Sequence, residues 1–156
     1  MSQSGTPPEG FELVPTGLGF TDTLQPFYRR IDREQISFGV RVDEQHLNLL
    51  GICHGGVLMT LADIAAASGV NHARGEQGGS PTINLSVDFI SSGKRGDWLQ
   101  ADTSSVTVKR RLGFCNGLIC NDRGIVARFN GTFYLPGHDG LWQGGKRPGT
   151  LADEAG

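Results

Sequence analysis

The sequence lacks any apolar run that approaches the ~20 residues needed to span a bilayer. Residues 1–17 lack the basic stretch followed by an apolar one that marks a secretory signal. There is no basic excess either, because the net charge is -2, and this argues against a general nucleic-acid binder. We therefore expect a cytoplasmic protein that binds neither membrane nor nucleic acid. A few local Lys and Arg residues would still suffice for a small anionic ligand.

Cysteine is also scarce. Only Cys53, Cys115 and Cys120 are present, they are unevenly spaced, and no CxxC occurs. We expect buried free thiols rather than a disulfide framework. His46, Cys53 and His54 lack a supporting second ligand pair, so no metal site is predicted.

The length of 156 residues fits one domain, and 37% hydrophobic with 19% charged residues is an ordinary globular balance. Residues 1–19 are rich in Pro, Gly and Ser, which predicts a flexible N-terminal arm with at most a short helical turn. Residues 137–156 contain similar Gly- and Pro-rich stretches and are predicted as a mobile C-terminal tail. The domain itself is expected over residues 20–136, and no internal repeat is visible in it.

Alternating apolar residues predict a series of strands, of which TINLSVDFI is the clearest because Ile83, Leu85, Val87 and Phe89 would face one way. The turn Asp122-Arg123-Gly124 joins the last two, with Gly free to take positive φ. The predicted strands cover residues 26–31, 35–42, 82–90, 99–108, 112–121 and 125–135.

Between the second and third of these strands the period becomes helical over residues 55–70, where the run Ala65-Ala66-Ala67 favours helix. One helix between two strands and four more strands is an α+β pattern. A long curved antiparallel sheet of about five to six strands, wrapped around one mostly apolar helix, satisfies it.

A cluster of Asn48, Gly51, His54-Gly55-Gly56 and Asp63 lies where the helix is expected to begin. It resembles the signature of the PaaI-type hotdog-fold acyl-CoA thioesterases, in which Asn, a glycine and His-Gly-Gly are followed by Asp nine residues after the His. Every position matches at the right spacing, and the resemblance extends from about residue 25 to 136. It implies the hotdog fold and hydrolysis of an acyl-CoA, with coenzyme A as part of the substrate and no other cofactor.

The chemistry of these residues agrees with that resemblance. A helix N-terminus offers unpaired N–H groups and a partial positive charge, so Gly55 N–H is suited to polarise a thioester carbonyl and hold the oxyanion. Asp63 supplies a carboxylate that either activates water or attacks directly. From the resemblance, Asn48 helps to position or polarise the thioester, Thr82 orients the water, and His54 shapes the loop beside the carbonyl.

Gly55 and Asp63 are eight residues apart, or ~12 Å along an α-helix, so one carbonyl group cannot contact both. Two such helices running antiparallel across a twofold axis would bring Gly55 of one chain towards Asp63 of the other. We therefore expect an obligate homodimer with two equivalent sites, which could pair further into a tetramer.

The resemblance also places the nucleotide of coenzyme A against loops that contain basic residues. The first loop is the stretch SSGKR, which comprises Ser91, Ser92, Gly93, Lys94 and Arg95. The second comprises Lys109, Arg110 and Arg111.

Each of these residues also has a structural interpretation. Gly55-Gly56 could have the purely structural role of allowing a tight turn. His54 could be a loop histidine whose hydrogen bonds are satisfied, and Asn48 could be a turn residue. Thr82 could be an ordinary strand threonine, and the basic run 109–111 a solvated turn. A carboxylate at Asp63 among apolar helix residues is costly unless it is paired, functional or exposed to solvent.

Two other functions stay open. A hotdog hydratase or dehydratase would act on the carbon chain of an acyl thioester, and a non-catalytic module would only bind acyl-CoA. The acyl group is expected to be a small aryl or a short to medium chain, since Phe27, Phe89 and the helix face could line its pocket.

Overall fold

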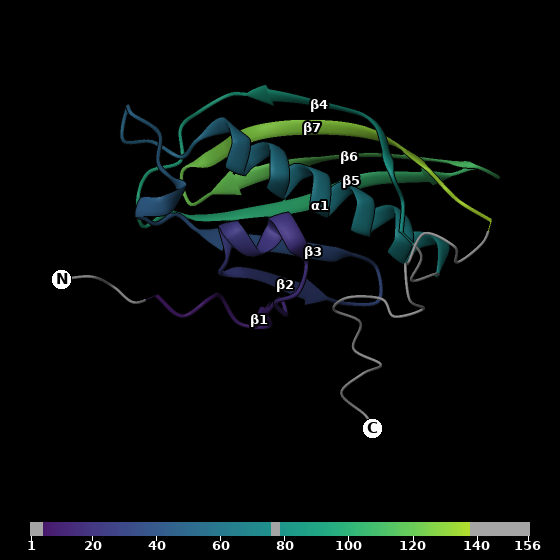
Figure 1. The fold of residues 1–156 in the computed structure, drawn as a ribbon, viewed down its shortest axis with the longest axis horizontal. Coiled ribbons are helices and arrows are strands. Elements are labelled where there is room, and N and C mark those ends of the chain that lie inside the picture. Colours follow the sequence, from purple (N-terminus) through teal and green to yellow (C-terminus); the bar gives the residue numbers. More distant parts are fainter. Residues whose placement is uncertain (1–4, 76–78, 138–156) are drawn as a thin grey trace.

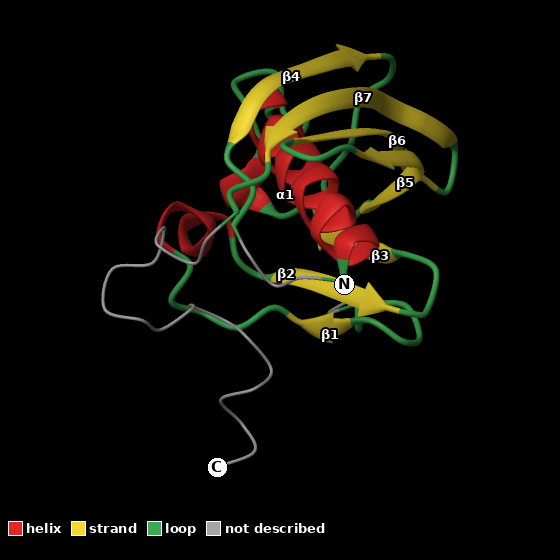
Figure 2. Cartoon of the chain, turned by 90° about the vertical axis from the view of Figure 1, so that its right-hand side faces the viewer, coloured by secondary structure: helices red, strands yellow, loops and turns green. Residues whose placement is uncertain are grey.

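The computed structural model describes residues 5–75 and 79–137, and there one long helix lies in the hollow of a curved antiparallel sheet (Figures 1 and 2). The helix α1 spans Gly55–Arg74, and two short 3-10 helices, η1 (Gly19–Leu24) and η2 (Glu44–His46), precede it. The strand order is β1-β2-β3-β5-β6-β7-β4. The strands are β1 (Glu12–Leu13), β2 (Phe27–Ile31), β3 (Ile36–Arg41), β4 (Thr82–Phe89), β5 (Trp98–Val108), β6 (Leu112–Asn121) and β7 (Gly124–Tyr134).

This architecture confirms the predicted hotdog fold. All six predicted strands are present within one residue at either end, and Gly124, the first residue of β7 after the turn, has φ 131°. In the part of the chain that the structure describes, the sheet has seven strands rather than five to six, because β1 pairs with β2 at the edge. A bulge between Thr82 and Asn84 interrupts the alternation expected at the start of β4, and Ile83 is therefore mostly exposed.

The sequence of α1 explains how it sits on the sheet. Its buried residues, which include Leu58, Leu61 and Val70, form one face against the concave side of the sheet. Each such Leu or Val stabilises the fold by roughly 1.5–3 kcal/mol. The helix continues one turn beyond the predicted end and stops at Gly75, which adopts the left-handed conformation at φ 66°.

Part of the N-terminal segment, residues 5–19 of the predicted arm, is described by the structure and contacts the sheet. Phe11 and Val14 are buried, and the Phe11 ring meets Trp98 edge-on at a centroid distance of 5.1 Å. Trp98 in turn covers Gly39, where any Cβ would collide with the indole. The segment therefore covers part of the outer face of β2, β3 and β5.

The predicted C-terminal tail, apart from Gly137, lies outside the described residues. Within residues 5–75 and 79–137, no helix is both long and apolar enough to cross a membrane.

Candidate active site

The loop before α1 is built on Asn48. Its side-chain oxygen accepts hydrogen bonds from the N–H groups of Leu50 at 2.9 Å and Ile52 at 3.3 Å, so the residue forms a turn. Gly51 in this turn has φ 73°, which favours glycine. Because the turn engages the acceptor oxygen, the Asn48 amide presents its NH₂ group as a donor. Asn48 and His54 line the same surface hollow of about 660 Å³.

His46 holds this loop from beneath. It is fully buried, its Nδ1 accepts the N–H of Asp43 at 3.0 Å, and its Nε2 lies 3.0 Å from the Leu24 carbonyl oxygen. Its own carbonyl accepts the N–H of His54 at 2.8 Å. A neutral ring that accepts at Nδ1 and donates at Nε2 satisfies both contacts. His46 therefore links η1, η2 and the start of α1.

His54 caps the helix. Its Nδ1 accepts the N–H of Gly56 at 2.7 Å, and its carbonyl accepts the N–H of Val57 at 2.9 Å. Within the described chain, no acceptor pairs with the N–H of Gly55. The cap thus leaves one amide at the positive end of α1 available to an outside oxygen.

Asp63 lies two turns further along α1 and is half-buried. Its Oδ1 accepts a hydrogen bond from Thr82 Oγ1 at 2.7 Å, across a separation of 19 residues. Oδ2 has no hydrogen-bond partner within residues 5–75 and 79–137. The structure therefore brings together the two side chains predicted to activate water, although their catalytic roles stay predictions.

Strand β4 connects the two ends of the candidate site. It begins at Thr82, beside Asp63, and ends at Phe89, whose ring would lie 3.4 Å from a Cβ built at Gly55. Gly55 and Asp63 themselves are ~12 Å apart along the helix. One chain therefore holds an amide donor and a carboxylate that a single thioester carbonyl cannot reach together.

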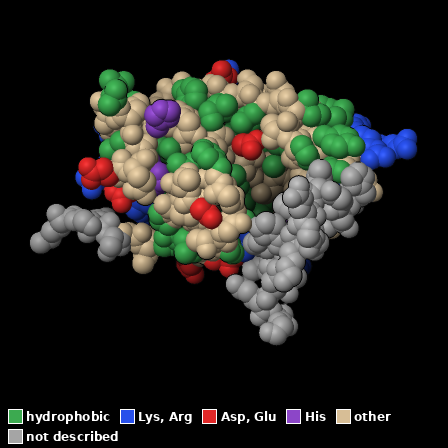
Figure 3. All heavy atoms as spheres, in the orientation of Figure 1, with side chains coloured by type: hydrophobic (Ala, Val, Ile, Leu, Met, Phe, Trp, Pro, Cys, Tyr) green, Lys and Arg blue, Asp and Glu red, His purple; other side chains and the backbone are tan. Residues whose placement is uncertain are grey.

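The two predicted basic regions lie at opposite ends of the molecule. Residues 91–95 adjoin the loop before α1, since Cys53 N–H donates to Gly93 O at 2.8 Å and Ile52 forms a bridge with Lys94. Residues 109–111 form the β5–β6 turn at the other end of α1, where basic side chains project in Figure 3. Within one chain, only the first region lies near Gly55.

The residues of the first region differ in how free their side chains are to contact a ligand. Ser91 Oγ donates to the Ile125 carbonyl at 2.7 Å, Gly93 is buried, and Arg95 lies 3.5 Å from both Asp43 and Glu44. Lys94 is exposed and has no ion pair among the described residues. Its ammonium is therefore the freest cation at this end of α1.

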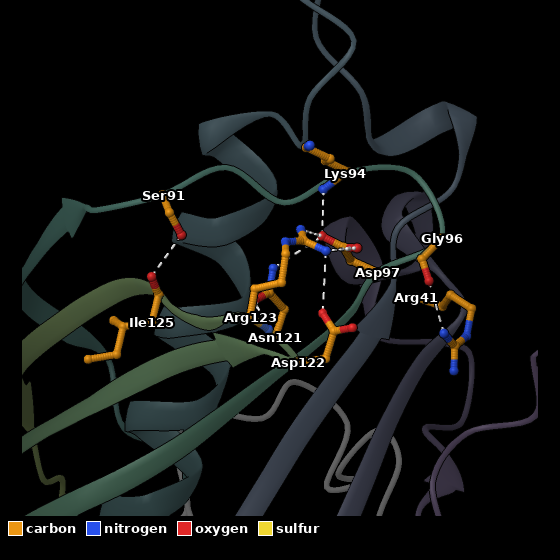
Figure 4. A network of polar contacts seen from close by, with 9 residues as sticks. All are labelled: Arg41, Ser91, Lys94, Gly96, Asp97, Asn121, Asp122, Arg123 and Ile125. Atoms are coloured by element: carbon orange, nitrogen blue, oxygen red, sulfur yellow. Dashed lines mark hydrogen bonds and ion pairs between the residues drawn. The ribbon is translucent and has the colours of Figure 1, made fainter.

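Sequence reasoning missed the network that fixes this loop. Asp97 accepts hydrogen bonds from Lys94 N–H at 2.8 Å, Asn121 Nδ2 at 3.1 Å and Arg123 Nη1 at 3.0 Å (Figure 4). Burial alone would raise the pKa of the Asp97 carboxyl, but these hydrogen bonds and the Arg123 charge hold that pKa below its usual range. The β6–β7 turn is thereby tied to the loop that contains Lys94.

We expect Asp97→Asn to lower the free energy of unfolding by about 1–3 kcal/mol at pH 7. Because the folded-state pKa is depressed, the stabilisation is present above the unfolded pKa of about 3.9 and is lost as pH falls through the folded value. Urea unfolding from pH 7 to pH 3 should show the gap between wild type and variant narrowing. Asp122→Asn, at the exposed second partner of Arg123, is the control and should change stability by less than about 0.5 kcal/mol. An equal gap at both pH values would contradict the assignment.

The cysteines behave as structural thiols. Burial raises the pKa of both Cys53 and Cys115 to about 11, so neither is a thiolate near neutral pH. All three cysteines are free. In the part of the chain that the structure describes, no three His, Cys, Asp or Glu side chains gather as metal ligands.

Comparison with known proteins identifies the family of this chain. The model of the thioesterase superfamily matches residues 50–128, from the loop before α1 into β7. The chain belongs to the thioesterase superfamily. A Pseudomonas aeruginosa protein named "Putative esterase" is 33% identical over 130 residues, which cover 83% of this chain and 97% of that protein.

Solved structures of this superfamily share the fold. The E. coli PaaI protein from the phenylacetic acid degradation operon is 31% identical, with a TM-score of 0.60 over 67% of this chain and 74% of that one. A hypothetical thioesterase of Streptococcus pneumoniae, solved with coenzyme A, is 22% identical and has a TM-score of 0.66 over 82% and 97%. This chain is therefore similar in fold to PaaI proteins, as its sequence motif predicted.

Proposed function

We propose that this chain is an acyl-CoA thioesterase that hydrolyses a small aryl or a short to medium acyl-CoA. The observation that supports this most is the pair of groups on α1: an unpaired Gly55 N–H at the helix start and a Thr82-bonded carboxylate at Asp63. The similarity to a thioesterase solved with coenzyme A favours an acyl-CoA over other esters.

In the proposed reaction, Gly55 N–H donates to the thioester oxygen and stabilises the oxyanion that develops there. Asn48, which lines a surface hollow together with His54, adds its NH₂ donor. Asp63 of the partner subunit takes a proton from a water that Thr82 orients, and the resulting hydroxide attacks the carbonyl carbon. The C–S bond then breaks, and the products are a carboxylate and the free thiol of coenzyme A. Direct attack by the carboxylate would form an anhydride that water opens to the same products.

The surface around the site supports a shared active centre. Leu49 and Leu50 beside Asn48 are almost wholly exposed, and Phe89 and Ile90 at the end of β4 are each 54% exposed. β4 is also the last strand of the sheet, so its outer edge has no strand partner within the described chain. Exposed apolar side chains beside an open strand edge are typical of an interface. A second copy of this chain would supply the missing half of each site.

Measurement of thiol release across a panel of acyl-CoAs tests the proposal. We expect turnover with short-chain or aryl acyl-CoAs and a protein mass of at least a dimer. Hydration of crotonyl-CoA without thiol release would instead indicate a hydratase. Tight acyl-CoA binding without either reaction would indicate a binding module, and an active monomer would contradict the shared site.

A further inference from the structure

A cavity of about 190 Å³ lies between η1 and α1, over the inner face of β2 and β3. Figure 1 shows η1 beside α1 there, and the same face is hollowed in Figure 3. We call it the η1 cavity. Its walls include Leu18 and Thr21 from the N-terminal segment, Phe27 and Arg29 from β2, and Ile64 and Ser68 from α1.

The η1 cavity is connected to Asp63 through α1, because the wall residue Ile64 is the next residue of the helix. Ile64 directly follows Asp63, so their Cα atoms are about 3.8 Å apart, and Ser68 lies about one turn further along the same helix. A thioester held at Asp63 could therefore extend its acyl group past Ile64 into this space. The coenzyme A part of the substrate would extend from Asp63 towards the N-terminus of α1.

The wall formed by the N-terminal segment is fixed by hydrogen bonds. The Asp22 carboxylate accepts the N–H groups of Gly17 at 2.8 Å and Leu18 at 3.2 Å. At the other end of η1, the carbonyl of Leu24 lies 3.0 Å from Nε2 of the buried His46. A wall held at both ends cannot retreat at little cost to admit a longer group.

One wall residue of the cavity, Arg29, is charged and paired. Arg29 donates from Nε to Glu12 at 2.9 Å, and their side chains are 12% and 55% exposed. An alkyl chain that grew past this point would have to separate the pair or remove the guanidinium from its partner, which costs free energy. The ion pair therefore puts a charged group in the wall of the cavity, which opposes the entry of a longer alkyl chain.

We propose that the η1 cavity receives the end of the acyl group and limits it to a single ring or a chain of about six carbon atoms, with Leu18 and Ser68 as size-determining residues. This inference rests on the proposed thioesterase function. An engineered protein cavity of about 150 Å³ holds benzene, so about 190 Å³ is a suitable volume for a group of that size.

The test compares kcat/KM for straight-chain acyl-CoAs of two to twelve carbons. Ser68→Leu fills the cavity, and we expect a loss of at least about 10-fold with hexanoyl-CoA but less than about 3-fold with acetyl-CoA. Leu18→Ala enlarges it and should move the optimum to longer chains. Leu24→Ala is the matched control, because this half-buried leucine of η1 packs on the core without lining the cavity.

A binding measurement separates the two proposals. In an Asp63→Asn background, which spares the thioester, the Kd of hexanoyl-CoA should rise on Ser68→Leu while that of acetyl-CoA stays unchanged. A chain-length effect on Kd without wild-type hydrolysis would retain the cavity and overturn the proposed function. Equal responses of both ligands, or a wild type that turns over dodecanoyl-CoA as well as hexanoyl-CoA, would overturn the cavity assignment.

Discussion

The Asp63→Asn variant is expected to hydrolyse acyl-CoA roughly 10²- to 10⁴-fold more slowly in kcat than the wild type. An amide has the shape of the carboxylate but can neither accept the proton from water nor attack the carbonyl carbon. Thr82 Oγ1 can still donate to the side-chain oxygen, so the local structure should persist. Thiol release at saturating substrate is the direct measurement.

Asp88→Asn is the control for this change. Asp88 lies on β4, is exposed, pairs with Arg128 at 2.7 Å, and takes no part in the proposed chemistry. We expect its kcat to stay within about twofold of wild type, because surface ion pairs contribute little to stability. Full activity of Asp63→Asn, with normal substrate binding, would remove the carboxylate from the mechanism.

Replacing Gly55 by Pro should lower kcat by roughly 10²- to 10³-fold, the usual cost of deleting one oxyanion donor. Proline is well accommodated at the first position of a helix, and the preceding His54 already has the extended conformation (φ -63°, ψ 137°) that proline requires. The substitution thus removes the N–H and little else. Gly55→Ala keeps the N–H, and its Cβ would lie at an ordinary 3.4 Å from Phe89, so it should retain most of the activity.

These two variants together test whether the site is shared. In a dimer of one Gly55→Pro chain and one Asp63→Asn chain, one of the two sites would contain both intact groups. Random reassembly of an equal mixture should therefore recover about a quarter of wild-type activity, because half of the dimers are mixed and each has one working site. Equal inactivity of the mixture and of each parent would contradict the exchange of residues between subunits.

Local patterns predicted most of the fold. The alternation of residues 35–42 and the helical spacing after Gly55 correspond to β3 and α1 in the structure, because each segment keeps a single hydrophobic period along its length. The role predicted for Thr82 came from aligning TINLSVDFI with the family rather than from a fixed motif, and no pattern in the sequence indicated that its hydroxyl contacts Asp63. The β1 strand was not predicted, because two residues show no period and their pairing with Arg29 and Tyr28 depends on tertiary contacts.

The arrangement of charges was the least predictable part. The sequence identified a turn at Asp122-Arg123-Gly124 but gave no sign that Arg123 reaches back 26 residues to Asp97. It also grouped residues 91–95 with residues 109–111, although the pairing of β3 with β5 and of β5 with β6 puts them at opposite ends of α1. Such relations depend on strand order and side-chain reach, which a linear pattern does not contain.

The position of β7 in the sheet affects the order in which the strands can pair while the protein is being synthesised. β7 is the last strand within residues 5–75 and 79–137, yet it lies between β6 and β4, and Thr82 pairs with Phe133. While translation is still upstream of residue 124, β5 and β6 can form a hairpin, but β4 has no strand to join. The nascent chain therefore lacks an anchored Thr82 beside Asp63 until its last strand has emerged, and a ribosome that stalls earlier would release a chain with an exposed β4 and an incomplete water-activating pair.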